Sequence, residues 1–144
     1  MSGTFSNYME THVLDGVTGK VTTTPFVSPV YLCLCTTVPD SSKTGATIVE
    51  ATYTGYARQS LAAAAWNSAS SGGAGAASST SNNGTITFAA CTGGSSTIIG
   101  WALCDSATTG AGNMILWGSC TSTVISTTQT PATVASGGIS ITLI

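Results

Sequence analysis

The chain has 144 residues, which is enough for one domain of ordinary size with its own core. Only 6% of the residues are charged, against about 25% in a typical globular protein, and Ser, Thr, Gly and Ala supply more than half of the sequence. The three basic residues are dispersed along the sequence and cannot form the basic surface that binds nucleic acid. No apolar run is long enough for a membrane helix. The composition favours a protein packed against neighbours in an assembly, with a secreted Ser/Thr-rich domain as the alternative.

The first 16 residues predict a helical arm. Residues 4–14 have the three- and four-residue spacing of a short amphipathic helix, with Thr4 or Ser6 as its N-cap and Asp15-Gly16 as its end. The apolar face comprises Phe5, Tyr8, Met9, His12 and Val13. No basic start followed by an apolar core precedes it, so we do not expect a signal peptide.

The middle of the chain alternates between strand signals and breaks. Residues 19–29 are Thr-rich with two prolines and predict an extended connector, whereas 30–37 read as a central strand that is apolar on both faces. Residues 52–61 predict another strand. The four alanines that follow are compatible with either a helix or a coil. Residues 68–83 are low-complexity Ser, Gly and Ala, which predicts a flexible exposed loop.

Short strands separated by Gly-rich breaks dominate the rest of the sequence. They are expected at residues 85–89, 97–104, 113–120 and 138–144. The pattern predicts one all-β domain over residues 1–144, an antiparallel β-sandwich or jelly-roll-like fold with a short N-terminal helix. The expected core comprises Leu32, Leu34, Ile86, Phe88, Ile99, Leu103, Ile115 and Ile141.

Both ends of the sequence suggest assembly. The N-terminal helix has a large apolar face for an arm, and the last predicted strand needs a partner in its own sheet or in a neighbouring subunit. We therefore expect a homo-oligomer, with a trimer favoured, in which one or both termini cross the subunit boundary. The expected interface residues are Phe5, Tyr8, Met9, Val13, Ile139, Ile141 and Leu143.

Residues suited to catalysis are scarce. The only histidine lies on the apolar helix face, the carboxylates are scattered, and the five cysteines lack zinc-ligand spacing, so we expect no catalytic residue, metal site or cofactor. Arg58, the only arginine, is either exposed or held in a buried ion pair by Glu50 or Asp105. Trp101 and Trp117 lie in predicted strands and are expected in the core. The alternative is a carbohydrate-binding face that uses Trp66, Trp101 or Trp117.

Several segments together resemble a known family. The stretches VYLCLCTTVPDSS, GYARQSL, NNGTITFAACTGG and IIGWALCDSATTGAGNMILWG, in this order after a short helix, resemble a family of small tailed-bacteriophage virion proteins. Members are labelled tail or tail-fibre proteins, and some look like capsid decoration subunits. The five cysteines and the very low charge depart from the family pattern.

The resemblance implies a non-enzymatic virion structural protein that is made in the host cytoplasm. We expect a decoration subunit that binds the major capsid protein lattice, because no fibre shaft or receptor-binding tip is visible in the sequence. The first alternative is a minor tail or tail-fibre protein of the same virion. A carbohydrate-binding module is the alternative from another class, and a glycan-cleaving enzyme lacks a carboxylate pair.

Overall fold

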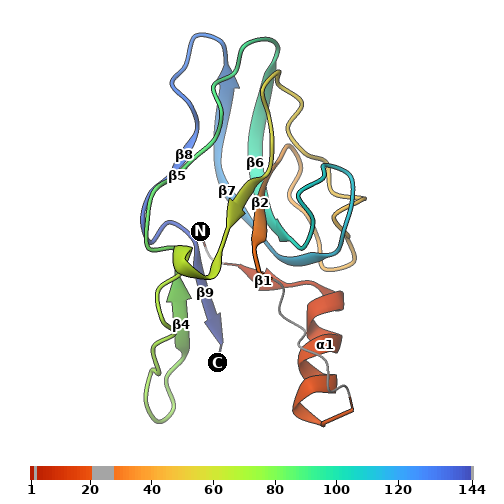
Figure 1. The fold of residues 1–144 in the computed structure, drawn as a ribbon, viewed down its shortest axis with the longest axis vertical. Coiled ribbons are helices and arrows are strands. Elements are labelled where there is room, and N and C mark those ends of the chain that lie inside the picture. Colours follow the sequence, from red (N-terminus) through yellow and green to blue (C-terminus); the bar gives the residue numbers. More distant parts are fainter. Residues whose placement is uncertain (2, 21–27, 144) are drawn as a thin grey trace.

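A five-stranded antiparallel sheet forms the centre of the fold in the computed structural model, which describes residues 1, 3–20 and 28–143 (Figure 1). Its strands lie in the order β1-β7-β6-β2-β3. In that order they span Thr4–Phe5, Met114–Ser126, Ser95–Cys104, Val30–Cys35 and Gln59–Leu61. The longest contact is the hairpin of β6 with β7, which carries two register shifts, one between Ile98 and Gly100 and one between Leu103 and Cys104.

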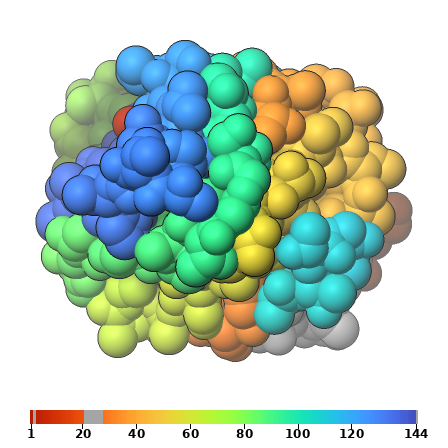
Figure 2. Space-filling view, turned by 90° about the horizontal axis from the view of Figure 1, so that it is seen from above, coloured from red at the N-terminus to blue at the C-terminus, as the bar shows by residue number. Residues whose placement is uncertain are grey.

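Smaller elements surround this sheet. Strands β5 (Ile86–Thr87) and β8 (Thr133–Val134) form one antiparallel ribbon, and β4 (Ser78–Ser81) and β9 (Ser140–Leu143) form another. The ribbon of β4 and β9 and the helix α1 (Asn7–Val17) project from the same end of the molecule (Figure 1). Figure 2 shows the opposite end, where the turns and loops around residues 84–95 and 120–135 lie beside those of residues 36–58, with the loop of residues 105–112 at one side.

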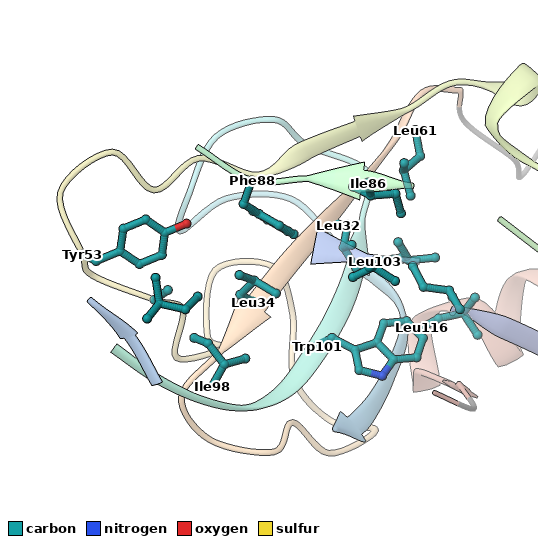
Figure 3. Packing of buried hydrophobic residues seen from close by; sticks show 14 of the residues in the cluster. Leu32, Leu34, Tyr53, Leu61, Ile86, Phe88, Ile98, Trp101, Leu103 and Leu116 are labelled. Atoms are coloured by element: carbon teal, nitrogen blue, oxygen red, sulfur yellow. The ribbon is translucent and has the colours of Figure 1, made fainter. Parts of the chain in front are cut away.

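The main hydrophobic core lies between the large sheet and the ribbon of β5 and β8. Leu32, Leu34, Trp101 and Leu103 point from the sheet toward Phe88 and its neighbours of the smaller layer (Figure 3). The domain is thus a sandwich of one large and one small layer, and the all-β antiparallel class with an N-terminal helix is confirmed. Burial of such large side chains stabilises the fold by about 1.5–3 kcal/mol each.

The other face of the large sheet holds a second, smaller core. It comprises Cys33, Cys35, Ile48, Ala102, Cys104 and Met114. Leu32 and Leu34 of β2 face the main core while Cys33 and Cys35 face this one, so the prediction of a strand buried on both faces is confirmed.

The N-terminal segment differs in detail from the predicted helix over residues 4–14. Thr4 and Phe5 form β1, and α1 begins at Asn7 because the Ser6 hydroxyl caps it by accepting a hydrogen bond from the Met9 N–H at 3.3 Å. The helix continues through Gly16 to Val17, and its last turn is closed by the Thr18 N–H, which donates to the Leu14 carbonyl at 3.0 Å. Only residues 19, 20, 28 and 29 of the predicted connector fall among the described residues.

Two other segments also depart from expectation. The predicted strand over residues 52–61 is a strand only at its end, because Gly55 adopts a positive φ of 102° and the Tyr56 N–H closes a turn on the Tyr53 carbonyl. Residues 68–83 are not a loop throughout: β4 pairs with β9, and Ser70 forms a β-bridge with Ser79. Backbone hydrogen bonds, which leave no trace in the hydrophobic pattern, order this Ser-rich stretch.

The expected core is confirmed for Leu32, Leu34, Ile86, Phe88 and Leu103 and wrong for Ile99. The register shift after Ile98 reverses the alternation of side chains, so Ile98 is buried in the core and Ile99 is only half-buried. The other two predicted core residues, Ile115 and Ile141, are half-buried and pack against the main core.

This register can be tested with two matched substitutions. Ile98→Val should lower the free energy of unfolding by about 0.5–1.5 kcal/mol, because it leaves a gap in the core. Ile99→Val, the control, removes the same methyl group from a half-buried site and should cost less. Urea titrations of both variants provide the measurement, and a larger loss for Ile99→Val would contradict the register.

Candidate functional site

Arg58 forms the one fully buried ion pair among the described residues. Its guanidinium lies 2.7 Å from the Glu50 carboxylate, and the two side chains are 0% and 4% exposed. Arg58 Nε also donates to both Glu50 oxygens, at 3.1 and 3.3 Å. The two alternatives for Arg58, exposed or paired, are thereby resolved: it is paired, and with Glu50. Asp105 instead accepts from the backbone N–H and the side-chain amide of Asn113.

Backbone carbonyls complete the coordination of Arg58. Nη1 donates to the carbonyls of Ser106 at 2.7 Å and Ala111 at 2.9 Å, and Nη2 donates to that of Gly45 at 2.8 Å. Every nitrogen of the guanidinium is therefore hydrogen-bonded, as a desolvated arginine requires. These bonds connect two surface loops, around residues 45 and 106–111, to the start of β3.

Glu50 has further donors of its own. The Tyr56 hydroxyl donates to it at 2.7 Å and the Gly110 N–H at 3.3 Å. Burial alone would raise the pKa of Glu50, but the hydrogen bonds from Arg58 and Tyr56 outweigh it and hold this pKa below its ordinary value. For Tyr56, burial and the neighbouring carboxylate raise the pKa far above its usual range, so this hydroxyl stays a donor. The site is a closed structural network with all of its polar capacity in use.

The lowered pKa of Glu50 predicts a pH dependence of stability. A carboxyl group whose pKa is lower in the folded state than in the unfolded chain stabilises the fold. Its contribution is complete at pH values above the unfolded pKa of about 4.3. This contribution is lost as the pH falls from there through the folded pKa. Unfolding measured from pH 7 to pH 3 should show this acid loss, and Glu50→Gln should flatten the curve below pH ~4.5. An unchanged slope in the variant would contradict the assignment.

All five cysteines are free thiols. Cys33 and Cys104 lie closest, with 3.6 Å between their sulfur atoms, in the smaller core. Burial raises the pKa of Cys35 to about 12 and raises that of Cys33 well above its ordinary value. Since the thiolate is the reactive form, these two residues act as small apolar side chains of the core.

The two predicted interface segments lie close together in the structure. The N-terminal amine donates to the Gly138 carbonyl at 2.8 Å, the Gly3 N–H donates to Ser140, and the Ser140 N–H donates to Met1. The beginning of the chain thus lies beside the start of β9, at the base of the ribbon of β4 and β9.

The predicted interface residues differ in exposure. Met9 and Ile139, 3% and 0% exposed, are buried within their own chain and are not available to a partner. Phe5, Tyr8, Val13 and Ile141 are half-buried, and Leu143 is 56% exposed. The helix also presents Leu14 and Val17, which the helical periodicity did not place on the apolar face; they are 65% and 82% exposed.

The tryptophans do not form a common platform. Trp101 is 1% exposed and belongs to the main core. Trp66 packs against this core and Trp117 against the smaller one, on the opposite face of the large sheet. A carbohydrate-binding face of coplanar indoles is therefore not assembled in the monomer.

These features define a class of protein: a small, charge-poor β domain whose buried polar network supports its loops. Among the described residues no group of three or more His, Cys, Asp or Glu could hold a metal ion. Within the same part of the chain, no helix combines the length and apolar character needed to cross a bilayer.

The family of the chain follows from its sequence as a whole. A family model described as "Podophage GP4 fiber I protein gp80" matches residues 4–142, so the chain belongs to this family of podophage fibre proteins. The resemblance to tailed-phage virion proteins is thereby confirmed, and the protein is a structural component of a phage virion. No curated protein matches the chain.

Proposed function

We propose that this protein is a non-enzymatic subunit of a podophage tail fibre, present in several copies per fibre. The observation that carries the proposal is the match of the fibre family over residues 4–142, nearly the whole chain. Head decoration, favoured by the sequence reasoning, has less support, since it rested on the absence of a visible shaft and the family is described by a fibre protein.

The structure adds physical support for a structural role. Arg58 and Glu50 use their polar groups to fix loops. The surface carries few charges, so little electrostatic repulsion opposes close packing of subunits. Synthesis in the host cytoplasm and assembly with other virion proteins complete the proposal.

The location and copy number in purified virions test it. Antibodies against the chain, viewed by immunogold electron microscopy, should label the tail, and quantitative mass spectrometry should find far fewer copies than of the major capsid protein. Labelling spread over the head, at a copy number comparable with that of the major capsid protein, would contradict the fibre assignment and favour decoration.

A further inference from the structure

Strand β9 has an open edge. Its other edge pairs with β4 over residues Ser140 to Leu143. Across the open side, only Ser140 has partners among the described residues, because Met1 and Gly3 bond its N–H and carbonyl. The backbone beyond Ser140 on this side therefore lacks a neighbour in the part of the chain that the structure describes.

Backbone N–H and carbonyl groups point to alternate sides along a strand, and this alternation shows which of those in β9 lack a partner. Ser140 directs its N–H and carbonyl away from β4, toward the N-terminal residues. Two residues further, Thr142 directs its own N–H and carbonyl to the same side, whereas those of Ile141 point to β4. The open edge thus offers one donor and one acceptor at Thr142, and both are ready for an added strand.

A notch of about 270 Å³ adjoins this edge. It separates β9 from β1 and the first turn of α1, and Phe5, Leu116 and Ile141 contribute its apolar lining. Glu10 is its only charged lining residue. An extended segment entering the notch would gain the hydrogen bonds of Thr142 and cover half-buried apolar side chains, the combination by which strand addition binds.

The charge pattern favours a second copy of the chain as the occupant. Apart from Asp105, the sequence has no charged side chain between residues 59 and 144. The ribbon of β4 and β9 and the flanking residues 66–70, together called the arm, lie wholly in this stretch. Within this stretch the two surfaces meet without like-charge repulsion, and Glu10 at the notch is the one charged side chain that borders the contact.

The arm also supplies a matching edge. Residues 66–70 flank β4 on the side away from β9, with Ser70 bonded to Ser79 in both directions. Ala69 is exposed, and its N–H and carbonyl have no hydrogen-bond partner among the described residues, so both are available to an added strand. Pairing the β9 edge of one copy with the Ala69 edge of the next satisfies both edges in every copy, and such a head-to-tail contact closes into a ring if its rotation allows.

We propose that the open edge of β9 binds the 66–70 edge of a second copy of this chain, so that the arms of neighbouring subunits form one continuous sheet. This inference deepens the proposed function and rests on it for its biological setting, but self-association is measured on the isolated protein. A virion location other than the fibre would therefore leave the self-association result standing, and the reverse also holds.

Light scattering after size-exclusion chromatography tests the contact with two variants of one residue. Thr142→Pro removes the outward N–H without touching the β4 ladder and should weaken self-association about tenfold or more. Thr142→Val keeps the N–H and the shape, so it should associate like the wild type. Equal melting temperatures of the three proteins show that the fold is intact.

Amide hydrogen exchange on the wild type gives a second readout that needs no variant. The Thr142 and Ala69 amides should exchange slowly at high protein concentration and quickly after dilution. The proposal is overturned by a wild type that stays monomeric at all concentrations, or by Thr142→Pro associating as strongly as the wild type. Equally fast exchange of both amides in the associated state would overturn it as well.

Discussion

Arg58→Met should lower the free energy of unfolding by about 3–5 kcal/mol, because it leaves the Glu50 carboxylate buried without its counter-ion. The carbonyls of Gly45, Ser106 and Ala111 lose their donor at the same time. For a chain of this size the melting temperature should drop by about 10 °C or more. Calorimetry gives the melting temperature and denaturant titration the free energy.

Lys20→Met is the matched control for this loss. It also removes a cation from an ion pair, but Lys20 lies 3.7 Å from Asp15 with 76% of its side chain exposed. An exposed pair of this kind contributes at most about 1 kcal/mol. Similar losses in the two variants would show that the Arg58 network does not stabilise the fold as its geometry indicates.

Asn82→Leu is expected to have the second large effect, about 2–4 kcal/mol. Asn82 is 1% exposed, and its amide donates to the carbonyls of Gly84 and Ala135 and accepts from the Ile139 N–H. A leucine of similar volume offers none of these groups, so the buried Ile139 N–H is left without a partner. Because Asn82 joins the arm to the body, amides of β4 and β9 should also exchange faster.

Asn83 provides the control for this substitution. It is the next residue, it is exposed, and its side chain makes one hydrogen bond, to the Ala64 carbonyl at 2.6 Å. Water can replace that bond, so Asn83→Leu should cost less than about 1 kcal/mol. If both variants unfold at the same denaturant concentration, the junction does not depend on Asn82.

Elements whose signal lies within a few consecutive residues were predictable from the sequence, and elements that depend on distant contacts were not. Strand β2 was predictable because its two apolar faces lie within six consecutive residues. Ile98 and Ile99 were confused because the shift that reverses their orientation depends on how β6 meets β7, which no local pattern encodes. The β4–β9 pairing was missed for a related reason, since it joins a Ser-rich stretch to a strand about 60 residues away through backbone groups alone.

The buried ion pair could be anticipated in part. A single arginine in a charge-poor chain had few carboxylates to choose from, and both Glu50 and Asp105 were sensible candidates. The sequence alone did not show which carboxylate pairs with Arg58. Glu50 and Arg58 lie on the two sides of the turn at Gly55, whereas Asp105 accepts hydrogen bonds from Asn113 across its own loop. The carbonyls that complete the site belong to loops whose courses depend on the finished fold.

The charged side chains are confined to residues 10–20, residues 40–58 and Asp105, and this has a consequence for the stability of the particle. Dissolved ions screen interactions between exposed charges but hardly affect backbone hydrogen bonds, apolar contacts or an ion pair sealed from solvent. A fibre held together in this way would keep its strength in dilute fresh water and in concentrated brine alike. Ionic conditions outside the host would then have little influence on when its subunits come apart.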